Sequence, residues 1–223
     1  MKIKFAPSIL SADFTELGAQ MKETERARAP YAHIDVMDGN FVPQVSFGEP
    51  VVKSIRKATN QFFDVHLMVN NPDHFIHHMA DAGADGITFH LEAVNDPGAL
   101  IARIHEHGCK VGLAIKPGTP VEAILPYVQR IDMLLIMTVE PGFGGQSYIP
   151  TSTDKIRRAR MMFDDYGLDT DIEVDGGIKL DNVDVVLEAG ANVIVAGSAV
   201  YKGDVYRNTK AFVDHFEAWE ENH

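Results

Sequence analysis

The stretch 63–91, FDVHLMVNNPDHFIHHMADAGADGITFHL, contains the repeating unit on which the fold prediction depends. An apolar run of strand type at 63–69 is followed by a segment with helical spacing at 72–82, and a second apolar run lies at 86–91. A proline opens the helical segment and Gly83 follows it, which are common start and stop signals of a helix. The stretch therefore predicts two parallel strands joined by a helix.

The same alternation of strand and helix occurs eight times along the chain. Strands are predicted at 3–10, 32–37, 63–69, 86–91, 110–115, 133–139, 171–174 and 193–196. Helices are predicted at 14–29, 50–58, 72–82, 97–107, 119–130, 152–166, 180–189 and 205–219. Evenly spaced units favour a closed (β/α)8 TIM barrel, and no Gly-x-Gly-x-x-Gly motif follows the first strand to suggest an open doubly wound sheet. We therefore expect residues 1–223 to form one catalytic barrel domain.

The composition is that of an ordinary globular protein, and it narrows the range of partners. Of 223 residues, 45% are hydrophobic, and 20 Lys and Arg stand against 32 Asp and Glu, which gives a net charge of -12. Such a charge repels nucleic-acid phosphates and anionic lipid, so we expect neither nucleic acid nor membrane as a partner. The single cysteine, Cys109, excludes an internal disulfide, and no signal peptide is visible. These features predict a cytoplasmic protein.

Ionisable side chains interrupt three strands that should be apolar if both of their faces are covered. The two-residue period of a strand places His33 with Asp35 on one face of the second strand, and Asp64 with His66 on one face of the third. The seventh strand ends in the sequence EVD, which closes with Asp175. Because the chemistry of such barrels takes place at the carboxyl ends of the strands, we expect these groups to meet at one mouth.

Two histidines and two aspartates at one mouth are a suitable ligand set for Zn²⁺ or another borderline divalent cation. For any single residue the alternative is a hydrogen-bonded core side chain, but four buried ionisable groups from three strands need a common compensation, which a cation supplies. The other histidines are predicted to lie on solvated helix faces, and Cys109 to be a packed small residue; these histidines are His74, His77, His78, His105, His107, His215 and His223.

Glycine-rich segments follow the sixth, seventh and eighth strands, at 141–146 (PGFGGQ), 175–178 (DGGI) and 196–199 (AGSA). The loops after strands seven and eight are the habitual phosphate site of these barrels. Glycine lets backbone N–H groups approach an anion closely, and none of the three segments contains Lys or Arg. We therefore expect a phosphorylated small molecule whose phosphate is held by backbone amides and whose other end meets the metal.

Asp35 and Asp175 would approach such a substrate from different sides. A metal between them would bind a carbonyl oxygen and the neighbouring hydroxyl and stabilise an enediolate. One aspartate can then remove a carbon-bound proton while the other returns a proton to the opposite face, which is an epimerisation beside a ketone. Met37, Met68 and Met137 are expected to cap the reacting centre, with core packing as an equal alternative.

Six motifs in order resemble those of ribulose-phosphate 3-epimerases along nearly the whole chain: 6–14 (APSILSADF), 33–39 (HIDVMDG), 64–68 (DVHLM), 141–146 (PGFGGQ), 173–178 (EVDGGI) and 196–199 (AGSA). The resemblance implies metal ligation by His33, Asp35, His66 and Asp175, with Asp35 and Asp175 as the acid/base pair. It implies substrate contacts from Ser8, His66, Gly142, Phe143, Gly144, Gly145, Asp175, Gly176, Gly177, Gly197 and Ser198. It also implies interconversion of D-ribulose 5-phosphate and D-xylulose 5-phosphate at C3, in the pentose phosphate pathway, by a homo-oligomer that uses one divalent metal per subunit. Zn²⁺ is the first choice, with Fe²⁺, Mn²⁺ and Co²⁺ as alternatives.

Other functions remain open at this stage. The chain departs from similar proteins at Asn40 and Gln44, in the loop after the second strand, which bears on substrate range and on subunit contacts. An allulose-6-phosphate 3-epimerase would use the same chemistry. A phosphosugar decarboxylase or lyase would usually recruit a lysine, for which Lys116 is the candidate. A protein that only binds phosphate would need neither the two carboxylates nor the metal.

Overall fold

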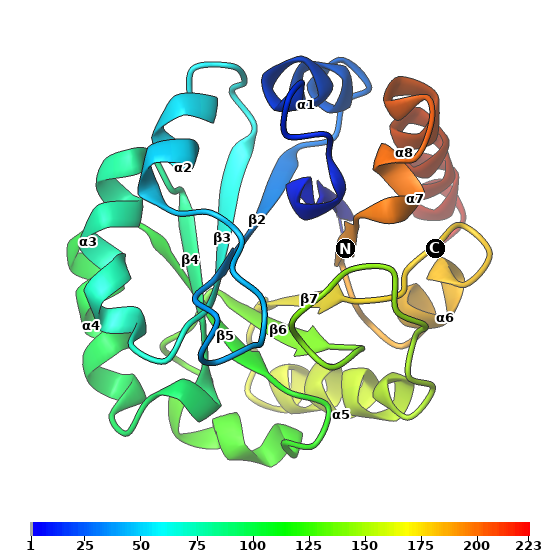
Figure 1. Ribbon diagram of the computed structural model, residues 1–223. Coiled ribbons are helices and arrows are strands. Elements are labelled where there is room, and N and C mark those ends of the chain that lie inside the picture. Colours follow the sequence, from blue (N-terminus) through cyan, green and yellow to red (C-terminus); the bar gives the residue numbers. More distant parts are fainter. Residues whose placement is uncertain (1) are drawn as a thin grey trace.

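The computed structural model describes residues 2–223, in which eight parallel strands form one sheet that curves into a barrel with the helices outside it (Figure 1). The strands are β1 Lys4–Pro7, β2 Tyr31–Met37, β3 Phe62–Met68, β4 Gly86–His90, β5 Lys110–Ile115, β6 Met133–Met137, β7 Asp171–Asp175 and β8 Val193–Ala196. Their order is β1-β8-β7-β6-β5-β4-β3-β2, and a parallel bridge between Ser8 and His33 joins the two ends of the sheet. The predicted (β/α)8 TIM barrel is confirmed.

The helices follow the predicted alternation, with one change of type. The α-helices are α1 Leu17–Arg26, α2 Glu49–Ile55, α3 Pro72–Ala82, α4 Pro97–Glu106, α5 Ser152–Asp165, α6 Val183–Glu188, α7 Ser198–Tyr201 and α8 Val205–Asn222. Three 3-10 helices are η1 Ile9–Ser11, η2 Leu91–Ala93 and η3 Val121–Tyr127. The helix expected at 119–130 is the 3-10 helix η3, because Pro126 inside it has no N–H for an α-helical hydrogen bond. Across the described residues, no helix combines the length and apolarity that crossing a bilayer requires.

Several helices of this chain are followed by a residue in the left-handed conformation. Gly83 after α3 and Gly190 after α6 both have φ of +105°, a left-handed conformation that glycine adopts without steric cost. After α1 the corresponding position is Arg28, with φ of +71°, and Pro30 follows it before β2 begins. The chain therefore reverses at Arg28 through a left-handed residue even though no glycine is available there.

The apolar core lies between the barrel and its helices, so the polar residues inside the strands stand out. Phe5 of β1 stacks on Phe212 of α8 with ring centroids 4.7 Å apart and meets Phe216 edge-on at 5.5 Å, which fixes the last helix to the first strand. Every residue of β2 is buried, including His33 and Asp35. The ionisable side chains with no exposed surface are His33, Asp64, His66, His90 and Glu173. All of them belong to the site described next.

Candidate active site

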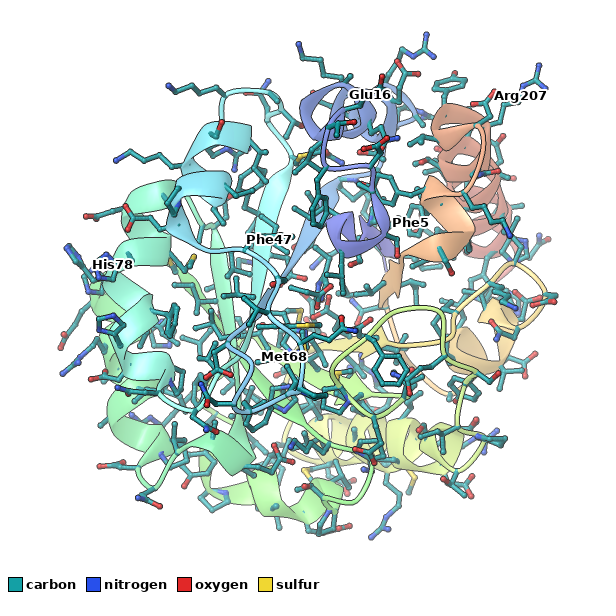
Figure 2. All side chains as sticks on the ribbon, viewed as in Figure 1. Phe5, Glu16, Phe47, Met68, His78 and Arg207 are labelled. Carbon is teal, nitrogen blue, oxygen red and sulfur yellow. The ribbon has the colours of Figure 1, made fainter. Side chains whose placement is uncertain are left out.

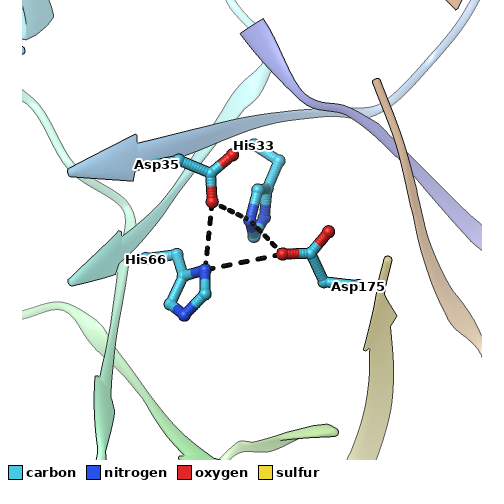
Figure 3. A group of neighbouring side chains, drawn as sticks. All are labelled: His33, Asp35, His66 and Asp175. Carbon is cyan, nitrogen blue, oxygen red and sulfur yellow. Dashed lines mark hydrogen bonds and ion pairs between the residues drawn. The ribbon is translucent and has the colours of Figure 1, made fainter. Parts of the chain in front are cut away.

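Four of the predicted residues meet at the carboxyl ends of three strands (Figure 3). β2 carries His33 and Asp35, β3 carries His66, and β7 ends in Asp175. The pairing of β2 with β3 sets Asp35 beside His66, and β7 approaches from across the barrel. His33 Nε2 and His66 Nδ1 lie 3.2 Å and 3.1 Å from Asp35 Oδ1, and 3.8 Å and 3.7 Å from Asp175 Oδ2. The structure therefore brings together side chains that are far apart in the sequence.

The donor atoms of this cluster fit a divalent cation. Two imidazole nitrogens and two carboxylate oxygens lie within 4.8 Å of one another, with one atom from each residue. Tetrahedral ligands of Zn²⁺ with bonds of about 2.0–2.1 Å lie roughly 3.3 Å apart, close to the separations found here. Borderline nitrogen and oxygen donors of this kind suit Zn²⁺ and its first-row neighbours. The four residues could therefore hold such an ion with small adjustments of their side chains.

The two aspartates have opposite pKa shifts. Burial acts to raise the pKa of Asp35, but the charge of His33 and the hydrogen bonds from His33 and His66 outweigh burial and hold that pKa below its ordinary value. Burial, followed by the negative charge of Asp35, raises the pKa of Asp175 to about 6. Ser8 adds to the difference because its hydroxyl donates to Asp35 Oδ2 at 2.6 Å. Asp35 is thus held in its ionised form, whereas Asp175 keeps a proton up to a pH of about 6.

Asp64 lies behind His33 and outside the four-residue cluster. Its Oδ2 is 2.7 Å from His33 Nδ1, the ring nitrogen that faces away from Asp35, and Glu173 Oε1 lies 3.3 Å from the same nitrogen. Within the described chain, Asp64 Oδ1 and both oxygens of Glu173 have no hydrogen-bond partner. A proton shared by the two carboxyls would pair Asp64 Oδ1 with one oxygen of Glu173, and burial together with the charge of Asp64 does raise the pKa of Glu173. The pair therefore orients His33 with one negative charge rather than two.

His66 has a different support, which the sequence analysis did not single out. Its Nε2 lies 2.9 Å from His90 Nε2 at the end of β4, and His90 Nδ1 lies 3.2 Å from Glu92 Oε2. Burial lowers the pKa of His90 to about 4, so the ring is neutral at physiological pH. Burial acts to raise the pKa of Glu92, but hydrogen bonds from His90 and Thr119 outweigh it and lower the pKa to about 2. The sequence signal that could have indicated this support is His90, a polar residue at the end of the strand GITFH.

A cavity opens above the cluster, with Asp35 and Asp175 in its lining, whereas His33 and His66 are fully buried. The three predicted capping methionines, Met37, Met68 and Met137, all line it. Met68 lies near the middle of the ring of helices in Figure 2. These methionines are also almost completely buried, so each one both lines the cavity and packs in the core. Four charged residues are among the described residues that line this cavity: Asp35, Asp175, Glu140 and Lys179.

The three glycine-rich segments line the same cavity, as predicted. The expected contact residues found there are Ser8, Gly142, Phe143, Gly144, Gly145, Asp175, Gly176, Gly177, Gly197 and Ser198. Gly177 has φ of +71°, and a Cβ there would lie 2.3 Å from the backbone nitrogen of Tyr148, so no side chain fits. His66, which was predicted to touch the substrate, is fully buried and is not among the described residues that line the cavity. The lining of the cavity thus combines the carboxyls of Asp35 and Asp175 with glycine backbone that no side chain covers.

Comparison with known proteins agrees with the motifs. A sequence model described as the ribulose-phosphate 3 epimerase family matches residues 4–201. The chain belongs to this family. It is similar to the ribulose-phosphate 3-epimerase of Synechocystis sp., with 48% identity over 95% of this chain and 93% of that one. It is also similar to that of Bacillus subtilis, with 47% identity over 89% and 92%, and to the cytoplasmic isoform of Oryza sativa subsp. japonica, with 45% over 89% and 87%. The prediction of an epimerase of this family is confirmed.

Solved structures of lower identity share the barrel alone. The thiamine phosphate pyrophosphorylase of Pyrococcus furiosus matches with a TM-score of 0.66 and 17% identity, covering 97% of this chain and 96% of that one. The tryptophan synthase α-subunit of the same organism matches with a TM-score of 0.72 and 18% identity, covering 97% and 98%. These likenesses confirm the fold and carry no information about the substrate.

Ser11 and Lys179 are among the residues of this epimerase family member that line the cavity and were not predicted. Ser11, inside the motif APSILSADF, lies so close to Gly197 that a Cβ on that glycine would be 2.5 Å from its hydroxyl oxygen. Lys179 directly follows the segment DGGI and adds a cation to a cavity lining to which the three segments contribute no Lys or Arg. Ser11 could have been found by considering each hydroxyl inside the motif, and Lys179 by extending the segment DGGI by one residue. The lining therefore offers side-chain donors in addition to backbone amides.

The remaining sequence candidates lie away from the cavity. His77 and His78 on α3 are exposed and pair with Asp81 and Glu49, which agrees with the predicted solvated face, and His78 is seen on the outer surface in Figure 2. Cys109 is buried, as expected for a packed residue. Asn40 and Gln44 both belong to the loop after β2, where the N–H of Asn40 donates to Asp38 Oδ1 and the carbonyl of Gln44 accepts from Gly39.

Proposed function

We propose that the protein interconverts D-ribulose 5-phosphate and D-xylulose 5-phosphate by epimerisation at C3. Membership of the ribulose-phosphate 3 epimerase family and the names of relatives at 45–48% identity support the reaction class. The observation that carries the proposal is the pair Asp35 and Asp175, which come from different sides of one cavity and have pKa shifts in opposite directions. Such a pair can treat the two faces of one carbon atom differently.

In this mechanism each aspartate serves one face of the substrate. Asp35, ionised and held by the Ser8 hydroxyl, accepts the proton from C3. Asp175, which retains a proton up to a pH of about 6, donates a proton to the opposite face, and the roles reverse for the other epimer. A divalent cation held by His33, Asp35, His66 and Asp175 would supply Lewis-acid stabilisation of the negative charge that develops on the substrate oxygens. Zn²⁺ is the first candidate, with Fe²⁺, Mn²⁺ and Co²⁺ as alternatives.

The glycine side of the cavity is proposed to hold the phosphate. Gly142, Phe143, Gly144 and Gly145 come from one loop, and Gly176, Gly177, Gly197 and Ser198 from the loops after β7 and β8. Backbone amides that are not covered by side chains bind an anion without a net positive charge, which suits a protein of charge -12. Met37, Met68 and Met137 would close the reacting end to water. The substrate would thus span the cavity from the amides to the aspartates.

We also propose that residues 1–223 act as one catalytic domain in a cytoplasmic homo-oligomer, with a sugar phosphate as the small-molecule partner. A lyase that uses Lys116 has less support, because Lys116 is not among the residues that line the cavity in the described chain and its ammonium instead lies 3.9 Å from the ring centroid of Phe41.

Isotope exchange tests the proposal. Purified protein with measured metal content is mixed with D-ribulose 5-phosphate in D₂O, and the product is analysed by NMR. We expect D-xylulose 5-phosphate that carries deuterium at C3, because the returned proton comes from a carboxyl in exchange with solvent. Release of CO₂ or of an aldehyde without deuterium at C3 would instead favour a decarboxylase or lyase. The same assay with allulose 6-phosphate measures the preference for chain length.

A further inference from the structure

A chain of polar groups leads from His66 away from the substrate cavity. His66 presents Nδ1 to the metal-facing cluster, with Asp35 Oδ1 at 3.1 Å, so its Nε2 points the other way. That Nε2 lies 2.9 Å from His90 Nε2, and His90 Nδ1 lies 3.2 Å from Glu92 Oε2. Neither His90 nor Glu92 is among the residues described as lining the cavity. Among the described hydrogen bonds, the one between His90 and His66 links these two residues to the four-residue cluster.

Glu92 has the surroundings of an ionised acceptor. Its Oε1 accepts the backbone N–H of Lys116 at 2.8 Å and the hydroxyl of Thr119, both from the loop after β5. Its Oε2 faces His90 Nδ1. A backbone N–H can only donate, so Oε1 is fixed as an acceptor, and an ionised carboxylate accepts on the second oxygen as well. The contact with His90 is therefore satisfied when His90 carries its proton on Nδ1.

The remaining proton positions follow from this one. A neutral His90 with its proton on Nδ1 has a lone pair on Nε2 and can only accept there. The 2.9 Å contact between the two Nε2 atoms then needs the proton to be on His66. With its proton on Nε2, His66 leaves a lone pair on Nδ1, directed at Asp35 and Asp175. An imidazole in this state is ready to bind a cation, whereas the opposite tautomer is blocked.

We propose that His90 and Glu92 are positioning residues that hold His66 in its Nε2–H tautomer and so prepare Nδ1 as a metal ligand. The inference rests on the proposed function, which places a divalent cation at the cluster. His33 reaches the same state by a shorter route, since its Nδ1 lies 2.7 Å from the Asp64 carboxylate. The described contacts of His66 Nε2 include no carboxylate. His90 lies between this nitrogen and Glu92, so the proton position that Glu92 favours on His90 determines the one on His66.

Two variants break the relay in different ways. Glu92→Gln keeps the shape, but a Gln side chain accepts on one oxygen only, and the N–H of Lys116 claims that oxygen. The amide NH₂ then faces His90 and reverses the order of protons up to His66. His90→Phe removes the relay and keeps a ring. We expect each variant to weaken Zn²⁺ binding about 10–100-fold, as measured by competition with a chromophoric chelator.

A conservative replacement and a control substitution far from the site distinguish a positioning role of His90 from a general loss of structure. His90→Gln can accept from His66 and donate to Glu92, so it should recover part of the lost Zn²⁺ affinity. Asp132→Asn alters a carboxylate that accepts the N–H of Val111 at 2.8 Å, outside the cavity and the relay, and should leave Zn²⁺ affinity unchanged. Urea unfolding of each metal-free variant checks that it folds. Nitrogen-15 NMR of histidine-labelled protein should show a protonated Nε2 on His66 in the wild type and loss of that state in Glu92→Gln.

The outcomes distinguish the inference from the function on which it rests. If the wild type binds Zn²⁺ and epimerises while Glu92→Gln and His90→Phe bind Zn²⁺ equally well, the relay is overturned and the proposed function stands. An equal loss of affinity in Asp132→Asn would also overturn the relay, because the effect would then come from the barrel as a whole. A wild type that neither binds a divalent cation nor exchanges hydrogen at C3 contradicts the proposed function itself.

Discussion

At the scale of single residues, the environment of each carboxyl decides its role. Asp35 and Asp175 are chemically identical, but their surroundings differ. Imidazoles lower the pKa of Asp35, whereas burial and the negative charge of Asp35 raise the pKa of Asp175. Because the ionised form of Asp35 is favoured and that of Asp175 is disfavoured, a base and an acid can coexist a few ångströms apart. The separation of the two pKa values thus depends on His33 and His66 as much as on the aspartates.

Removal of the titrating group from Asp175 tests its role directly. Asp175→Asn keeps the size of the side chain and its place in β7, so the fold should be retained. Turnover should fall by about 100-fold or more, since a positioned acid or base contributes on the order of 10²–10⁴. The measurement is kcat for ribulose 5-phosphate, with urea unfolding as the check of the fold. Near wild-type turnover in a folded, metal-loaded variant would rule out the assigned role.

The raised pKa of Asp175 predicts how metal binding depends on pH. In the metal-free protein Asp175 holds a proton below pH of about 6, and a metal must displace that proton, so affinity falls as the pH drops through this value. His33, whose pKa is also raised because nearby carboxylates outweigh its burial, releases its proton at either pH. Calorimetry in buffers of different ionisation enthalpy should therefore record more protons released per Zn²⁺ at pH 5.5 than at pH 7.5. Asp175→Asn should reduce this difference, and a wild type without any difference would contradict the assignment.

At the scale of elements, the backbone of the loop after β7 is built for close approach. Gly177 has φ of +71° and no room for a Cβ beside Tyr148, whereas Gly108 has φ of +75° with nothing within 4 Å. We expect Gly177→Ala to raise KM for the sugar phosphate by about tenfold, the equivalent of about 1.4 kcal/mol in binding. Gly108→Ala carries similar dihedral strain, of order 1–3 kcal/mol, far from the cavity. Equal effects of the two substitutions on KM would show that strain alone is responsible.

Most elements and the four-residue cluster of His33, Asp35, His66 and Asp175 were predictable, because regular spacing in the sequence indicated them. Strand period placed Asp35 with His33, and parallel pairing then brought β3 alongside. Elements without such spacing were missed: α7 is only one turn long, and Pro126 converted an expected α-helix into η3. The residues behind His66 were not predictable from the sequence. The contacts of His90 and Glu92 depend on which strands become neighbours, and that is a property of the closed barrel.

At the scale of the whole molecule, closure of the barrel gathers the site. β1 pairs with β8 and meets β2 only through the bridge at Ser8, the residue whose hydroxyl holds Asp35. The helix α8 covers this closure, with Phe5 between Phe212 and Phe216 (Figure 1). The last helix and the first strand therefore lie beside the closure at which Ser8 contacts Asp35.

Loss of the Phe5 ring should weaken this closure. Phe5→Ala removes a fully buried ring and is expected to lower the free energy of unfolding by about 3–5 kcal/mol. Met161→Ala, at a side chain that is 64% exposed on α5, is the control and should cost little. Urea denaturation of the metal-free proteins measures both. Similar losses for the two substitutions would mean that the β1 and α8 contact contributes less than its burial implies.

Exchange at C3 in single-aspartate variants tests the central claim most directly. Asp35→Asn and Asp175→Asn, each loaded with metal, are incubated separately with D-ribulose 5-phosphate and with D-xylulose 5-phosphate in D₂O. Two aspartates on opposite faces predict that each variant exchanges the C3 hydrogen of one epimer only, without epimerisation, and that the two variants select opposite epimers. Exchange of the same epimer by both variants, or full epimerisation by either one, would contradict the account.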